Sequence, residues 1–219
     1  MIRASSCAVL VIFLLTVDRL PAQSKPPSPS PTPSQSATPK PWGISLTLYG
    51  YLPSDQDGYA NPNVTADHGR LHLEARYNYE DLRTGSLWAG YNFHAGKTVE
   101  LKLTPMIGGV FGRTQGIAPG CQASLRYRKV ELSISNEYVF STSERAQSFY
   151  YSWPELTYSP VDWLSLGLAA QRTKPIHTKL DTQRGFVVGL SHKHAEFRAY
   201  VFNVGWTNPS LVLEVGWTF

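Results

Sequence analysis

The chain has 219 residues, of which 42% are hydrophobic and 16% are charged, and its formal net charge at pH 7 is +4. A positive charge this small, scattered along the chain, does not make the concentrated basic surface of a nucleic-acid-binding protein. No stretch reaches the roughly 18 consecutive apolar residues that a membrane-spanning helix needs.

The first residues have the layout of a secretory signal peptide. Arg3 precedes a ten-residue apolar run from Ala8 to Val17, and the small residue Ala22 offers a cleavage point. The run is too short to cross a bilayer as a helix. We therefore predict a signal peptide over residues 1–22 and export of the remainder. Cys121 is then the single cysteine, which excludes an internal disulfide.

Residues 23–41 form a segment of very different composition. The stretch from Ser24 to Pro41 contains seven prolines and seven serine or threonine residues. Such a segment has no apolar surface to bury and is expected to stay extended and disordered. It reads as a spacer, which leaves one folded domain over residues 42–219.

From Trp42 onward, apolar side chains return at every second position rather than with the helical period of about 3.6 residues. In the segment 70–80, for example, Leu71, Leu73 and Tyr77 alternate with charged and polar residues. Turn residues interrupt the alternation about every ten to fifteen residues, as in a chain of antiparallel strands. The predicted strands are 43–52, 69–79, 85–94, 98–110, 120–128, 130–141, 147–158, 161–172, 183–192, 194–204 and 210–219.

An up-and-down barrel needs an even number of strands, because both chain ends lie on the same side of the membrane. The segment 54–67 is therefore expected to contain a further, weak strand near Asn63 to Ala66. This gives about twelve strands, with ten to fourteen as the range. A bulge is expected near Pro154, since proline cannot donate to the ladder. Connections on the side where the chain ends are expected to be tighter than those on the opposite side.

Alternation alone fits two classes of protein. A soluble periplasmic barrel or sandwich would bury the apolar face and bind an apolar ligand, whereas a membrane barrel turns that face to lipid. Small residues on the polar face, the mixture of acidic and basic residues there, and export favour the membrane barrel. Aromatic residues at strand ends also favour it, as girdles at the two membrane interfaces: Trp42, Tyr49, Tyr51, Tyr91, Phe93, Tyr138, Phe140, Trp163, Trp206, Trp217 and Phe219.

The last nine residues, LVLEVGWTF, place Leu211, Leu213, Val215, Trp217 and Phe219 on one face. This segment resembles the C-terminal strand of bacterial outer-membrane β-barrel proteins, which typically ends on phenylalanine behind alternating apolar residues. The resemblance implies an all-β, antiparallel up-and-down transmembrane β-barrel in the outer membrane of a Gram-negative-type bacterium, surrounded by outer-membrane lipid. It also implies that the last strand pairs with the first and is read as a signal by the barrel-insertion machinery.

The polar faces of the strands then line the lumen. The charged and titratable residues predicted there are Arg70, His72, Glu74, Arg76, Glu80, Glu100, Lys102, Arg126, Arg128, Glu131, Glu137, Glu196, Arg198 and Glu214. Arginine and lysine nearly balance glutamate in this set, so no ring of one sign selects ions strongly. The sequence therefore predicts a non-enzymatic protein, either a narrow, weakly selective pore for small solutes or a structural envelope protein with a plugged lumen.

A hydrolase is the remaining alternative. His72 and Glu74 share one face, and Ser86 or Ser133 would have to approach them, but nothing in the sequence marks either serine as a nucleophile. His192 and His194 are two residues apart, and a metal site would need further ligands converging in space. We predict no catalytic residue, no metal site and no cofactor.

Overall fold

A computed structural model describes residues 41–219 apart from residue 56 and the segments 143–147, 176–180 and 206–207. The predicted signal peptide and nearly all of the predicted spacer lie outside the described residues. Among those that are described, no helix is long and apolar enough to cross a membrane.

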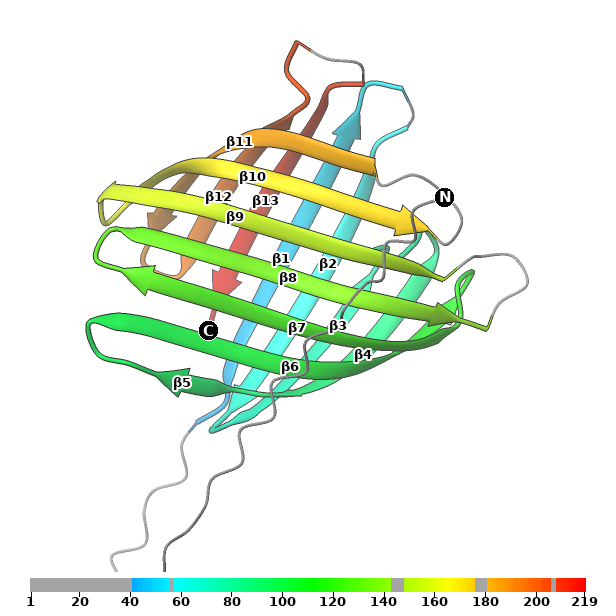
Figure 1. Cartoon of the computed structure of the whole chain (residues 1–219), viewed down its shortest axis with the longest axis horizontal. Helices are drawn as coiled ribbons and strands as arrows, with labels where there is room; N and C mark the ends of the chain where they lie inside the picture. The colour runs from blue at the N-terminus through cyan, green and yellow to red at the C-terminus, as the bar shows by residue number, and fades with distance from the viewer. Residues whose placement is uncertain (1–40, 56, 143–147, 176–180, 206–207) are drawn as a thin grey trace, which may run out of the picture. The chain divides into compact units, whose positions relative to one another are not determined.

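All of the regular structure described is β-strand, in the alternating antiparallel order expected from the sequence (Figure 1). The strands are β1 (Gly43–Pro53), β2 (Tyr59–His68), β3 (Leu71–Tyr77), β4 (Thr84–Tyr91), β5 (Phe93–Ala95), β6 (Val99–Gly112), β7 (Gly116–Tyr127), β8 (Val130–Ser141), β9 (Phe149–Val161), β10 (Leu164–Pro175), β11 (Asp181–His192), β12 (Ala195–Phe202) and β13 (Ser210–Thr218).

The sheet closes on itself, as the terminal strand predicted. β13 pairs with β1 from Thr218 opposite Ser45 to Ser210 opposite Pro53, and β4 pairs with β6. The short β5 also pairs with β6 and continues β4 beyond Asn92, so the two segments are one interrupted strand of the wall. The result is a closed antiparallel barrel of twelve strands, which confirms the predicted architecture and strand number.

The alternating pattern sorts side chains between the two faces of the wall. Phe186 and Val188 are 61% and 44% exposed on the outer surface, whereas Val187 between them is 2% exposed and faces the lumen. The same contrast separates the exposed Leu168 from the buried Ala169 on the neighbouring strand. The outer face is therefore apolar, the inner face carries the polar residues, and the predicted orientation of the strands is confirmed.

Connections differ at the two ends of the barrel. On the side where β13 ends, four turns contain two residues each, at 69–70, 128–129, 162–163 and 193–194. The opposite side carries the longer connections, including 78–83 and 203–209. This is the expected asymmetry between inner turns and outer loops of such barrels, and we call the two ends the inner and outer end.

Two local expectations need correction. The strand expected near Asn63 to Ala66 is β2, and it begins earlier, at Tyr59, because backbone pairing with β1 overrides the weak strand propensity of the YANPN segment. No bulge forms at Pro154. The β9–β10 register shifts between Leu164 and Leu166 instead, and Pro154 leaves a gap in the pairing, since its nitrogen carries no hydrogen.

The assignment of Tyr49 and Tyr51 to an aromatic girdle was wrong. Both pack inside the barrel, against the cluster that contains Trp153. The reason is the two-residue period of the strand: Leu46 and Leu48 face outward, so the odd-numbered tyrosines face the lumen. The predicted girdle residue Trp206 lies outside the described residues.

Candidate functional site

The site is the layer of side chains that crosses the middle of the lumen. Its first part surrounds Arg76 on β3, and we call it the Arg76 cluster: Asp67, His72, Glu74, Arg76, Glu80 and Glu137. Its second part, the Arg198 cluster, is Glu155, Glu196, Arg198, Tyr200 and Glu214. All members of the two clusters except Asp67, Glu155 and Tyr200 belong to the set of charged and titratable residues predicted to line the lumen.

Arg76 forms a bridge through the interior of the barrel. Its guanidinium donates from Nη1 to Glu137 at 2.7 Å, and its Nε lies 2.9 Å from Oε1 of Glu74. Glu80, in the connection after β3, lies 3.6 Å from Nη1. β3 and β8 are separated by three strands in the sheet, so the contact between Arg76 and Glu137 crosses the lumen rather than following the wall.

Aromatic rings enclose the same guanidinium. The Arg76 guanidinium carbon lies 4.3 Å from the ring centre of Tyr79 and 4.5 Å from that of Trp88, a distance at which cation–π attraction contributes. Burial raises the pKa of the Tyr79 phenol, so that its hydroxyl stays neutral. Trp88 in turn lies over Gly108 and Gly120, where a methyl group would collide with the indole ring.

Glu74 is the hub of the Arg76 cluster. It accepts hydrogen bonds from Asn63 at 2.5 Å and Gln122 at 3.0 Å, in addition to its ion pair with Arg76. His72 Nε2 lies 3.5 Å from the same carboxylate, and His72 Nδ1 lies 2.9 Å from Asp67. Both imidazole nitrogens therefore face carboxylates. Ser86 donates to Glu80 at 2.6 Å instead of approaching His72, so the arrangement expected of a hydrolase is not favoured.

The Arg198 cluster joins β12 and β13 to Glu155 on β9, which two strands separate from β12 in the sheet, and is more open. Arg198 pairs with Glu196 at 2.7 Å and with Glu155 at 3.0 Å, and its side chain is 28% exposed. The Tyr200 hydroxyl lies 3.1 Å from Glu155 and 2.7 Å from Glu214. The partly exposed guanidinium of Arg198 is in a position to meet a solute, whereas the buried guanidinium of Arg76 is not.

The other predicted lumen residues lie toward the inner end. Arg126 pairs with Glu131 at 2.6 Å at this mouth. Glu100 and Lys102 are exposed on β6, and Lys102 lines a cavity with Thr104 and Gln122. The structure does not bring the last two predicted residues, Arg128 and Arg70, into the layer. Arg128 lies in the β7–β8 turn, and Arg70 lies in the β2–β3 turn, where it donates to the Tyr91 hydroxyl at 2.8 Å.

Cavities lie on both sides of the layer. A cavity of about 280 Å³ opens toward the outer end, lined by residues that include Asn61, Tyr79 and Gln171. One of about 320 Å³ lies at the inner end, lined by residues that include Arg126 and Arg198. Between them a space of about 70 Å³ lies beside Tyr49, Trp153 and Glu155. The lumen thus has two polar vestibules and a narrow centre.

Sequence reasoning missed the aromatic part of the layer. Gln171 on β10 donates to the hydroxyls of Tyr51 at 3.2 Å and Tyr151 at 3.1 Å, which links opposite walls. Tyr79 meets Tyr151 edge-on, with ring centres 5.6 Å apart, and Tyr151 packs against the buried cluster that contains Trp153 and Tyr200. The sequence does indicate the inward position of Tyr51, because Tyr51 lies on the same face of its strand as the polar residues Ser45 and Thr47. Glu155 was missed because Pro154 obscured the phase of its strand.

Among the residues that the structure describes, no group of three or more histidine, cysteine and acidic side chains is placed to hold a metal ion. What the site offers is an uneven charge. The two clusters together hold seven carboxyl groups against two guanidinium groups and one imidazole. Carboxyl groups therefore outnumber basic groups in these two clusters, whereas the two kinds nearly balance in the set predicted for the whole lumen.

No protein-family model matches the chain, and no curated protein is similar to it in sequence. Solved structures do match. The KdgM porin superposes with a TM-score of 0.60 at 10% identity, covering 80% of this chain and 99% of that chain. The NanC porin gives a TM-score of 0.58 at 9% identity, covering 80% of this chain and 100% of that chain. The resemblance to outer-membrane β-barrel proteins, inferred from the last strand, is thereby confirmed for the fold, which this chain shares with porins.

Proposed function

We propose that the protein is a non-enzymatic outer-membrane channel that passes small polar solutes and prefers cations to anions. The closed barrel with an apolar outer face supports the location, because exposed side chains such as Leu87, Ile107 and Phe186 need lipid around them. The same surface speaks against a soluble periplasmic protein. The observation that carries the channel function is the charged layer between two polar vestibules.

The proposed cation preference rests on the carboxyl excess of that layer. Rings of acidic side chains attract cations and repel anions in a narrow, poorly screened passage. One solved structure of the KdgM porin is described as a complex with oligogalacturonate, an acidic saccharide. The centre of this lumen carries an excess of carboxyl groups, which would repel a saccharide of the same sign of charge, so we propose that acidic saccharides are poor solutes for this chain.

The test is single-channel recording with purified protein refolded in detergent and added to a planar lipid bilayer. Discrete current steps are expected. In a tenfold KCl gradient, the reversal potential should shift toward the equilibrium potential of K⁺, as it does in a cation-selective channel. Glu155→Gln together with Glu214→Gln, both in the Arg198 cluster, should lower that preference. Glu131→Gln, a change of the same chemistry at the exposed inner mouth, should lower it less.

Two results would contradict the proposal. An anion-selective channel would show that the layer does not control the passage. Protein that inserts but never conducts would show that the two clusters plug the barrel. The protein would then be a structural envelope protein rather than a channel. Heat-dependent migration in gels, which distinguishes folded from unfolded barrels, confirms that each variant is folded before it is recorded.

We also propose that the chain reaches the outer membrane through its two ends. Residues 1–22 would be removed as a signal peptide, residues 23–41 would remain as a periplasmic spacer, and the strand ending at Phe219 would be read by the barrel-insertion machinery. The backbone of Phe219 bonds to Ile44 at 2.9 Å, but its side chain is 72% exposed. Phe219→Ala should therefore reduce assembly in cells while leaving refolding in detergent intact.

A further inference from the structure

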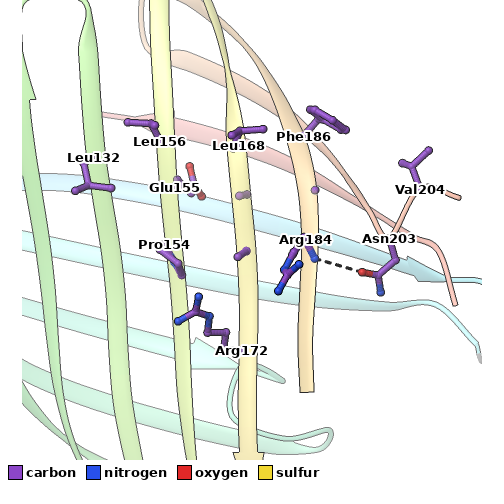
Figure 2. Close-up of a pocket in the computed structure, with 13 residues that line it drawn as sticks. Leu132, Pro154, Glu155, Leu156, Leu168, Arg172, Arg184, Phe186, Asn203 and Val204 are labelled. Carbon is purple, nitrogen blue, oxygen red and sulfur yellow. Dashed lines mark hydrogen bonds between the residues drawn. The ribbon is translucent and has the colours of Figure 1, made fainter. Parts of the chain in front are cut away.

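The outer face of the wall carries a groove over β8 to β11, shown in Figure 2, with a volume of about 560 Å³. Its sides are large apolar side chains: Leu132 and Leu156 on one flank, Leu168 and Phe186 on the other. All four side chains are at least 46% exposed. The rest of the outer face is apolar too, so what distinguishes this place is its volume and its charged end.

The floor of the groove lies where two residues with short side chains face each other across β9 and β10. Pro154 and Ala170 stand opposite one another in the β9–β10 register, and pairing is interrupted between Ala169–Glu155 and Arg172–Ser152. Pro154 cannot donate a hydrogen bond, and neither Pro154 nor Ala170 has a long side chain to fill the space. Both line the groove floor between the larger apolar residues.

Two arginines stand at the end of the groove nearest the outer loops. Ala170 pairs with Arg184 and Thr182 with Arg172, so the arginines are diagonal neighbours on the same face of the sheet. Figure 2 shows their guanidinium groups on either side of β10, beyond Leu168 and Phe186. Among strand residues whose side chains are described, these two are the charged ones on the outward face.

We infer that this groove binds a phosphorylated, acylated lipid of the outer leaflet, of the lipid A type. An acyl chain lies along Leu156, Leu168 and Phe186, and a phosphate is held between Arg172 and Arg184. The inference rests on the proposed outer-membrane location.

The position of the arginines selects a lipid over a free anion. Arginine at the edge of the apolar band places its stem along the band and its charged head at the level of the lipid headgroups. A guanidinium also binds phosphate through two parallel, charge-assisted hydrogen bonds. A zwitterionic headgroup carries no net negative charge, so two arginines attract it less than they attract a phosphate monoester. The site therefore needs both parts of the ligand, the chain in the groove and the phosphate at its end.

Native mass spectrometry of the full chain in neutral detergent tests the inference. The protein is mixed with diphosphoryl lipid A, with phosphatidylcholine or with inorganic phosphate. One tightly held lipid A is expected, with little retention of the other two. Arg172→Ala with Arg184→Ala should lower the lipid-bound fraction by about tenfold or more, as expected for the loss of charge-assisted bonds. Phe186→Ala should lower it less.

Arg70→Ala is the matched control, since Arg70 is an exposed arginine at the opposite end of the barrel. It should retain lipid like the wild type. Equal retention of lipid A by the Arg172/Arg184 double variant would overturn the inference, and so would equal retention of phosphatidylcholine by the wild type. The readout needs no ion current. A protein that binds lipid A but never conducts would refute the channel and leave this site standing.

Discussion

The two clusters of the lumen use the same chemistry in different surroundings. Arg76 is buried, bridges β3 to β8 and is covered by aromatic rings, whereas Arg198 is partly exposed and faces the inner vestibule. The attraction within an ion pair strengthens as water is excluded, but removing one member then leaves the other as a buried charge without a counter-charge. The difference suggests that the Arg76 cluster chiefly holds the barrel in shape, while the Arg198 cluster meets the solute.

The largest effect is expected for Arg76→Met. This change leaves Glu74 and Glu137 buried without their cation, and breaking a buried pair in this way costs about 3–5 kcal/mol. The free energy of unfolding, measured by urea titration of the refolded protein in detergent, should fall by that order. A loss no greater than that of Arg126→Met would show that the bridge is not a structural brace.

Arg198→Gln should separate function from stability. Because the side chain is partly exposed, we expect a modest loss of stability and a clear rise in cation preference, as Glu155, Glu196 and Glu214 lose their counter-charge. The measurement is the reversal potential of single channels in a KCl gradient. An unchanged reversal potential would place the selective part of the passage elsewhere.

Gly108→Ala probes the packing around the Arg76 cluster. The added methyl group would meet the Trp88 ring, and overpacking of this kind costs about 1–3 kcal/mol. Gly109→Ala is the matched control, because a methyl group there meets nothing within 4 Å. The free energy of unfolding, measured by urea titration, should be clearly lower for Gly108→Ala than for Gly109→Ala. Equal stability of the two variants would mean that Trp88 can move without cost.

The smallest effect is expected for Arg126→Ala at the inner mouth. Its pair with Glu131 is exposed, and pairs of this kind contribute less than about 1 kcal/mol. The free energy of unfolding, measured by urea titration, should hardly change. The channel current should differ from that of the wild type at low salt and approach it at high salt, where charges are screened. A salt-independent change would point to a steric role instead.

Most of the fold followed from the sequence because a strand has a period of two residues. Leu71, Leu73 and Tyr77 were assigned outward, and each is exposed on the outer face. The prediction failed where the period is interrupted or the propensity is weak. Pro154 hid the inward position of Glu155, and the polar YANPN segment hid the first half of β2.

By itself, the sequence determined the barrel, the orientation of its faces and the charged residues available to the lumen, since all three depend on alternation along single strands. The tertiary structure alone decided which of those residues meet. Whether Arg76 reaches Glu137, or Arg172 stands beside Arg184, depends on strand register and on the curvature of the closed wall. Those pairings join residues from different strands, and no local pattern in the chain records them.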